Sequence, residues 1–201
     1  MKITAFRLAA GILLTVQPAL AQDHVIKLFA TANYVYPLAD DDADIDAITD
    51  SIEVTDELGW EAGVEWRVNR LIGLEVSYLQ AEQDIEFGGD TLGEVETGMW
   101  TGAVNFHPID ADREKTDFWF APIVAFVDWD DIELRAGGSA EVDSEFGIGV
   151  AMGFDINIGK TLAITTGLRW LSLDLDSDTS GDFGVDPLIA RAGVAFRLGS
   201  R

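Results

Sequence analysis

The segment Glu145 to Asn157, EFGIGVAMGFDIN, alternates without interruption between large apolar residues and residues that are small or polar. A period of two over thirteen residues predicts a β-strand, because successive side chains of a strand point to opposite faces. The strand is longer than most strands of soluble sheets and suits a tilted crossing of a hydrocarbon layer. In an outer-membrane barrel its apolar face contacts lipid and its small face fills the lumen.

The N-terminus has the pattern of a cleaved export signal. Two basic residues precede the apolar stretch Ala9 to Val16, which is too short to span a bilayer, and Ala19-Leu20-Ala21 supplies the small residues that a signal peptidase reads. We therefore expect residues 1–21 to be a signal peptide and residues 22–201 to form one domain. No later segment approaches the length of about 18 apolar residues that a membrane helix needs, so strands are expected to cross the membrane.

The two-residue period recurs along the chain. Three of the links between the periodic segments are short, at 69–72, 108–116 and 157–160, and the other four are long. Alternating short and long links are typical of an up-and-down barrel with short periplasmic turns and longer external loops. The sequence therefore predicts an all-β fold, an eight-stranded antiparallel transmembrane β-barrel. Its strands are predicted at residues 25–36, 59–69, 73–82, 97–107, 117–128, 145–156, 161–173 and 187–198.

Charge is divided between the two kinds of link. The four long links, 37–57, 82–96, 128–143 and 174–186, hold 26 of the 36 acidic residues, and Arg135 is the only basic residue among them. The short links hold Arg70, Arg113, Lys115 and Lys160. A strongly negative external rim argues against nucleic acid as a partner.

Aromatic residues give a separate indication of a membrane. On the outward parity one group lies near the long links and a second group lies near the turns, as expected for the aromatic girdles of two membrane interfaces. A soluble β-sandwich or calycin-like barrel is the alternative, but it would turn the apolar face inward. The two groups are Tyr34, Tyr36, Trp60, Phe126, Phe146 and Trp170, and Trp66, Phe106, Phe118, Phe154 and Phe196.

The stretch Val185 to Leu198, VDPLIARAGVAFRL, resembles the closing strand of the outer-membrane protein W family, and Gly153-Phe154-Asp155-Ile156 and Leu168-Arg169-Trp170-Leu171 are also similar to that family. The likeness covers about the last third of the chain. It implies residence in the outer membrane of a Gram-negative bacterium, with the barrel assembly machinery and periplasmic chaperones as partners during biogenesis. The chain departs from the pattern by ending in Gly199-Ser200-Arg201, so Phe196 is expected to replace the terminal aromatic residue.

Strand parity places a charged set inside the barrel. Because unpaired ions in a narrow interior cost several kcal/mol each, we predict a salt-bridged plug with at least one carboxylate–arginine pair across the barrel. His107 is expected to belong to the same network. The predicted lumen charge network is Lys27, Glu65, Arg67, Glu75, Asp155, Arg169, Arg191 and Arg197.

Nearer the long links, the same parity becomes apolar. The predicted apolar mouth comprises Val127, Trp129, Leu171, Leu173 and Ile189. It resembles the small hydrophobic-ligand pocket attributed to the protein W family, which implies that the barrel binds or passes small hydrophobic molecules. The alternative is that these residues only close the top of a structural or surface-interaction barrel that transports nothing.

Catalytic and metal sites find little support. The only histidines, His24 and His107, fall on the turn side, whereas barrel enzymes need a histidine near the external face, so we expect no enzyme and no cofactor. Asp174, Asp176 and Asp178 share the spacing of a calcium loop, but the glycine of that motif is missing. We expect the acidic links to form a solvated rim that binds divalent ions loosely beside the phosphates of lipopolysaccharide.

Overall fold

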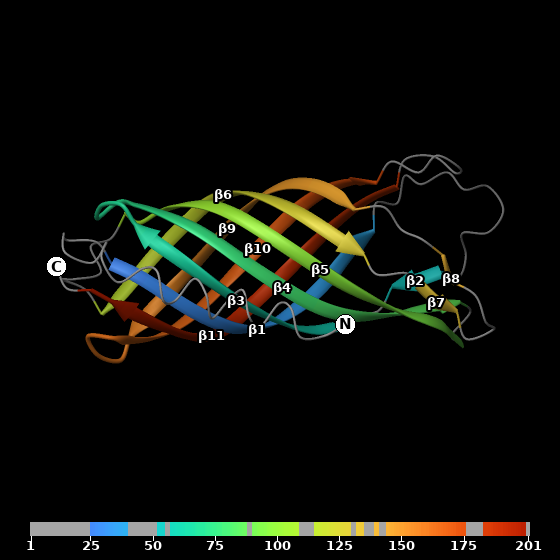
Figure 1. The fold of residues 1–201 in the computed structure, drawn as a ribbon, viewed down its shortest axis with the longest axis horizontal. Coiled ribbons are helices and arrows are strands. Elements are labelled where there is room, and N and C mark those ends of the chain that lie inside the picture. Colours follow the sequence, from blue (N-terminus) through green and yellow to red (C-terminus); the bar gives the residue numbers. More distant parts are fainter. Residues whose placement is uncertain are drawn as a thin grey trace.

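Eight long antiparallel strands close into a barrel (Figure 1). The computed structural model describes residues 25–39, 52–54, 57–87, 90–108, 115–129, 132–134, 139–140, 144–175 and 183–199. The barrel strands are β1 (Val25–Ala39), β3 (Glu57–Arg67), β4 (Ile72–Phe87), β5 (Asp90–Phe106), β6 (Thr116–Trp129), β9 (Glu145–Asn157), β10 (Leu162–Leu175) and β11 (Phe183–Leu198). No helix in these residues is long and apolar enough to span a membrane.

Each long strand pairs with the next along the chain, and β1 pairs with β11 to close the barrel. Three short strands, β2 (Ile52–Val54), β7 (Ile132–Leu134) and β8 (Ser139–Ala140), add to one end of the sheet through β4 and β5. We call this the loop end. The opposite end, with the tight links 68–71 and 158–161, is the turn end. The predicted eight-stranded up-and-down barrel is confirmed.

One predicted link is wrong. Residues 82–96 were expected to be a long acidic loop, but β4 and β5 continue through most of it and remain paired as far as Phe87 and Asp90, with a register shift at Ile85/Glu86. The physical reason is that a β-ladder is held by backbone hydrogen bonds, so acidic side chains do not end it. This hairpin extends the barrel wall at the loop end.

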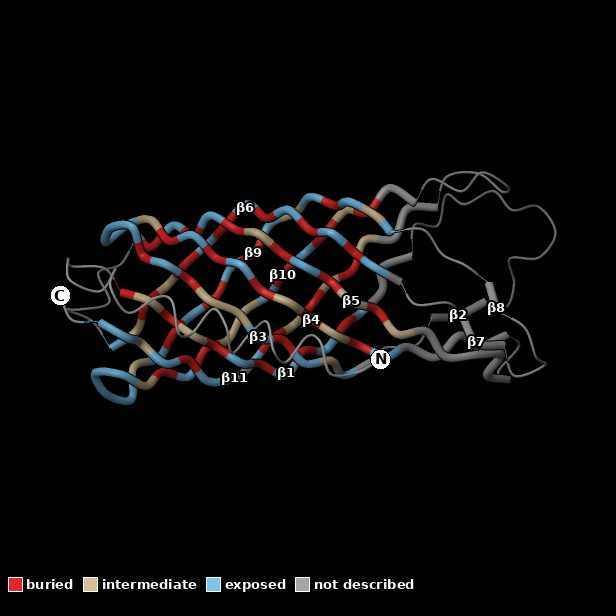
Figure 2. The backbone as a smooth tube through the Cα atoms, in the orientation of Figure 1, coloured by how far each residue is buried: buried red, intermediate tan, exposed pale blue. Residues whose placement is uncertain are grey.

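Burial alternates along every barrel strand, as Figure 2 shows. In β9 the apolar side chains from Phe146 to Ile156 are outside, where Phe146 is 64% and Val150 is 54% exposed, while Ala151 and Asp155 are buried in the lumen. Both predicted aromatic groups are largely on the outer surface, with Trp100 and Phe120 as further members. A continuous apolar outer surface of this kind is stable only against lipid.

Glycines on the inner face make room for the largest inward side chains. A Cβ built on Gly153 would lie 2.4 Å from the ring of Trp119, and one on Gly63 would lie 2.4 Å from the ring of Phe29. Both distances are far below van der Waals contact. The two rings therefore lie directly on the backbone of neighbouring parts of the wall, which is how a narrow eight-stranded barrel accommodates them.

Two prolines coincide with gaps in the pairing of the wall. The register of β5 with β6 has no pairs opposite Val104 and Asn105, beside Pro122, and that of β10 with β11 has none between Trp170 and Leu173, beside Pro187. Proline has no N–H to donate to a ladder. The barrel wall therefore has fewer hydrogen bonds at these two places than elsewhere.

Candidate functional site

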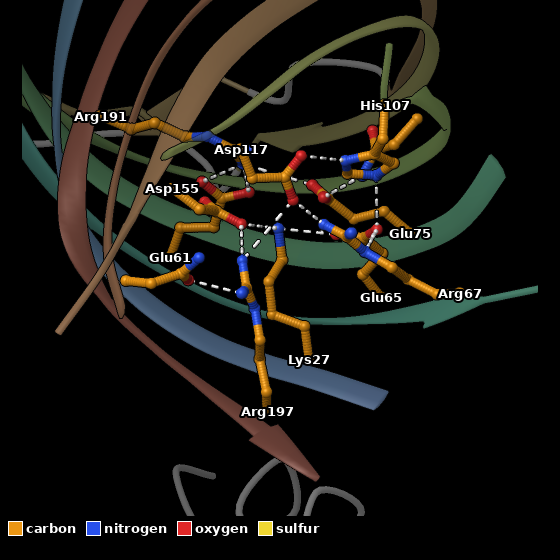
Figure 3. Close-up of polar contacts among 12 residues, drawn as sticks. Lys27, Glu61, Glu65, Arg67, Glu75, His107, Asp117, Asp155, Arg191 and Arg197 are labelled. Carbon is orange, nitrogen blue, oxygen red and sulfur yellow. Dashed lines mark hydrogen bonds and ion pairs between the residues drawn. The ribbon is translucent and has the colours of Figure 1, made fainter. Parts of the chain in front are cut away.

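A network of ion pairs fills the lumen at the turn end (Figure 3). Lys27 lies at its centre, with its Nζ 2.6 Å from Glu65 Oε2 and 3.0 Å from Asp155 Oδ2. Arg197 reaches the same Asp155 at 3.4 Å from the last strand. We call Lys27, Glu65, Arg67, His107, Asp117, Asp155 and Arg197 the turn-end layer. It joins β1, β3, β6, β9 and β11 across the interior.

Arg67 and His107 connect the two carboxylates on the other side of this layer. Arg67 Nε lies 3.1 Å from Glu65 Oε1, and its guanidinium also pairs with Asp117. His107 lies between the same two carboxylates, with Nε2 2.8 Å from Glu65 and Nδ1 3.1 Å from Asp117. Each carboxylate therefore faces more than one cation or N–H donor.

An aromatic layer lies above the turn-end layer. The guanidinium carbon of Arg191 is 5.2 Å from the ring centre of Phe29 and 4.7 Å from a ring of Trp119. Lys27 Nζ is 5.8 Å from a ring of each residue. Cations over ring faces at these distances are attracted by the ring quadrupole, and the attraction grows when water is excluded. Phe29 and Trp119 therefore form an aromatic layer that contacts Lys27 of the turn-end layer on one side and Arg191 on the other.

A second charged layer, the mid-lumen layer, comprises Glu61, Glu75, Arg169 and Arg191. Arg169 donates to Glu61 at 2.9 Å, and Arg191 Nη1 lies 3.4 Å from Glu61 Oε1 and 3.3 Å from Glu75 Oε1. Glu75 also accepts a hydrogen bond from Asn105 at 2.8 Å. These pairs link β3 and β4 to β10 and β11 through the middle of the barrel.

Within the two charged layers of the lumen, the register places like charges opposite each other in two positions. Glu65 faces Glu75 across β3 and β4, and Asp117 faces Asp155 across β6 and β9. Like charges directly opposite in a sheet destabilise it unless cations compensate them. Lys27 contacts one member of each pair, so its side chain holds the two acidic positions together.

At the loop end the lumen is apolar. Leu171 is fully buried, and Val127, Leu173 and Ile189 are each 2% exposed. We call these four residues, together with Val35, Leu79, Met99 and Ile123 of the same buried cluster, the loop-end layer. The backbone of Trp129 ends β6, but the side chain of this predicted mouth residue lies outside the described part of the structure. Among the described side chains, therefore, those predicted for the mouth are buried and apolar.

All eight charged residues predicted for the lumen lie inside it and join the two charged layers. The prediction omitted Glu61, Asp117 and the two inward rings. Glu61 shares the parity of Glu65, which could have identified it. Asp117 is the first residue of the predicted strand 117–128 and shares the inward parity of Trp119. Parity also places both rings inward, because Phe29 shares the parity of Lys27 and Trp119 that of Asp117, but their contacts with Gly63 and Gly153 on the neighbouring strands depend on the register.

Most of the predicted metal-binding carboxylates lie outside the residues that the structure describes. Asp176 and Asp178 fall outside the described residues, as does the side chain of Asp174, and so do the proposed signal peptide and parts of the acidic links. Within the described ranges no group of three or more acidic, histidine or cysteine side chains is arranged to hold a metal ion.

No protein-family model matches the sequence, and no curated protein matches it. Solved structures of similar fold include the following three. The outer membrane protein OprG from Pseudomonas aeruginosa has a TM-score of 0.69 and 11% identity, over 88% of this chain and 96% of that one. Neisserial surface protein A has a TM-score of 0.62 and 10% identity, over 85% and 96% of the two chains. Ail of Yersinia pestis, in complex with the heparin analogue sucrose octasulfate, has a TM-score of 0.54 and 15% identity, over 87% and 97%.

At these identities the likeness concerns the fold, which is that of small outer-membrane β-barrels. Together with the apolar outer surface and the closed sheet, it places the protein in the outer membrane. In this class the short turns face the periplasm and the long loops face outward. The turn end is accordingly the periplasmic end, and the loop end is the external end.

Proposed function

We propose that the protein is a closed, non-conducting barrel of the outer membrane that anchors acidic loops at the cell surface. Continuous burial of the lumen supports this: Lys27 and Glu65 near the periplasm, Trp119 in the middle and Leu171 near the outside are each no more than 1% exposed. We also propose that the protein is related to the protein W family and that it catalyses no reaction.

Three barriers in series support a closed lumen. An ion entering from outside must first shed its water to pass the aliphatic loop-end layer, which offers no charge in return. It then meets two layers of ion pairs separated by the rings of Phe29 and Trp119, where passage requires breaking several buried pairs at once. An eight-stranded barrel is just wide enough for side chains to fill, so no spare width remains.

The acidic links suggest what the outer rim does. Glu82 and Asp128 are exposed at the loop end, where they continue the acidic segments of the sequence, and Glu96 faces Glu82 across β4 and β5. Carboxylates beside the phosphates of lipopolysaccharide repel them unless divalent cations bridge the two. We infer that Mg²⁺ or Ca²⁺ bridges the carboxylates of this rim to the phosphates of lipopolysaccharide. In this proposal the external loops bind the cell surface and the lumen stays closed.

Conductance tests the closed lumen. Purified protein in a planar bilayer is expected to show no steady single-channel current, whereas a general porin added to the same membrane shows one. The variant Trp66→Ala, which changes an exposed ring on the outer surface, is a matched control and should be equally silent. A steady current through the folded wild type would overturn the proposal.

The rim is tested separately. In vesicles containing lipopolysaccharide, Mg²⁺ is expected to raise the urea midpoint of the wild type, and a variant with Asp40, Asp41, Asp42 and Asp44 changed to Asn should lose most of that rise. Neutralising Lys115 and Lys160 at the periplasmic end is the control and should leave the rise intact. If the urea midpoint of the wild type is the same in Mg²⁺ and in EDTA, the rim does not bind lipopolysaccharide through divalent ions.

A second candidate function is the binding of small apolar molecules. The loop-end layer is apolar around Leu171 and Leu173, and the gap in the β10–β11 ladder lies beside the same residues. Side-chain rearrangement there could admit an alkyl chain, with exit sideways because the ion-pair layers block the axis. A brominated alkyl alcohol should then quench Trp129 saturably in the wild type and not in Leu173→Asp. Lack of saturable quenching in folded wild type removes this candidate.

A further inference from the structure

His107 has an unusual position at the periplasmic end of the lumen. It lies one residue beyond the end of β5, it is fully buried, and a carboxylate oxygen faces each of its ring nitrogens (Figure 3). Glu65 Oε1 is 2.8 Å from Nε2, and Asp117 Oδ1 is 3.1 Å from Nδ1. The ring therefore connects β3 to β6, two strands that are not neighbours in the wall.

This arrangement requires a proton more than a neutral ring carries. A neutral imidazole has one N–H and one lone pair, so it can donate to only one of two acceptors, and its lone pair would face the other at close range. Glu65 is also paired with Lys27 and Arg67, and Asp117 is paired with Arg67, which keeps both carboxylates ionised. The additional proton therefore belongs on His107.

Charged groups from several strands surround the ring. Facing the ring are Glu65 and Arg67 from β3 and Asp117 from β6. The next charged groups are Lys27 from β1, Glu75 from β4, Asp155 from β9 and Arg197 from β11. Without His107 the turn-end layer has three carboxylates and three cations, so the imidazolium adds one positive charge, held by two direct carboxylate contacts.

The ring lies beside the open turn end of the barrel. A hollow of about 530 Å³ at the turn end is lined by His107 and Pro108 together with the link residues 69–72. The backbone N–H of His107 also donates to the carbonyl of Leu71 at 2.8 Å, which fixes the ring beside the hollow. The pair of carboxylates is thus dry, while the histidine that joins them borders the open end of the barrel.

We propose that doubly protonated His107 is a pH-sensitive clamp that holds β3 and β6 together across the periplasmic end of the lumen. Loss of its second ring proton as pH rises frees Glu65 or Asp117 from the ring and loosens the turn-end layer. Burial by itself lowers the pKa of His107, but the hydrogen bonds to Asp117 and Glu65 raise it above the ordinary value. A raised folded-state pKa means that the stabilisation is complete below about pH 6.5 and is lost as pH rises through the folded value.

Nuclear magnetic resonance of the ring nitrogens tests the protonation directly. The chain has two histidines, so His24→Asn leaves His107 as the single signal in protein labelled at histidine. Both ring nitrogens of His107 are expected to keep their protons to a higher pH than those of a free imidazole, whose pKa is about 6.5. A neutral ring at pH 6 in the folded protein would overturn the clamp.

Unfolding as a function of pH tests the clamp's effect. The gap in unfolding equilibrium constant between wild type and His107→Gln should shrink as pH rises above 6.5, by up to tenfold per pH unit, because one proton is released. The His24→Gln variant is the control and should follow the wild type at every pH. Parallel curves for wild type and His107→Gln would contradict the proposal, and if His107→Gln does not fold, the nitrogen signals of the single-histidine protein decide.

Discussion

The periplasmic and external halves of the lumen are equally dry but opposite in chemistry. In the periplasmic half, Lys27 contacts carboxylates at 2.6 and 3.0 Å and is 1% exposed, while in the external half Leu171 is fully buried in an aliphatic cluster. Ion pairs gain their energy only at short range and with suitable geometry, whereas aliphatic contacts are non-directional. The stability of the periplasmic half therefore depends on which charged groups are paired, and the stability of the external half depends on how well apolar side chains fill the space.

The difference has a consequence for how each half fails. Removing one member of a buried ion pair leaves an uncompensated charge, so the damage comes from the partner that remains. Removing part of an aliphatic side chain leaves a cavity, so the damage comes from lost contacts. A second substitution should therefore repair the first kind of damage and not the second.

The largest effect is expected at Lys27. Lys27→Met should lower the free energy of unfolding by about 3 to 5 kcal/mol, because Glu65 and Asp155 stay buried without their shared cation. Adding Asp155→Asn to this variant should restore part of the loss, measured by urea unfolding in lipid vesicles as a double-mutant cycle. Purely additive costs would mean that the layer is not a coupled network.

Arg197 provides the matched comparison within the same layer. It reaches Asp117 and Asp155 at 3.5 and 3.4 Å, but its side chain is 12% exposed, so water compensates part of what it loses. Arg197→Met should accordingly cost less than Lys27→Met. The reverse order would show that depth in the lumen does not set the cost.

In the external half the effect should be smaller and should resist repair. Leu171→Ala is expected to cost about 2 to 5 kcal/mol by leaving a cavity in the loop-end layer. A second truncation at Leu173 should add to that cost in the same unfolding assay, because neither substitution leaves a charge for the other to relieve. Recovery of stability in the double variant would break the contrast between the two halves.

The sequence revealed which residues point inward, because the parity of a strand is visible in its own residues. That is why the eight lumen charges could be predicted from period two alone, and why Glu61, on the same parity as Glu65, was within reach. The exact partners were not, since the contacts of Lys27 with both Glu65 and Asp155 depend on the stagger of β1 against β3 on one side and against β11, β10 and β9 on the other. Stagger is a property of the closed sheet rather than of one strand.

Two other features were hidden for related reasons. The β4–β5 hairpin continues through an acidic segment that looks like a loop, because backbone pairing leaves little trace in side-chain composition. Parity places Trp119 inward, but an inward tryptophan fits only where glycines face it, and Gly153 and Gly167 belong to strands later in the chain. Such complementary pairs become visible only once the register is known.

The boundary between the two halves gives the smallest predicted effect. Gly153→Ala should cost about 1 to 3 kcal/mol, because its Cβ would lie 2.4 Å from the ring of Trp119 and 2.2 Å from a carbonyl oxygen of the neighbouring strand. In a Trp119→Leu background the ring contact is gone, so the cost should fall without vanishing. Gly159→Ala, where nothing lies within 4 Å, is the control and should change the urea midpoint little. An equal cost for Gly153→Ala in both backgrounds would show that the indole ring does not rest on Gly153.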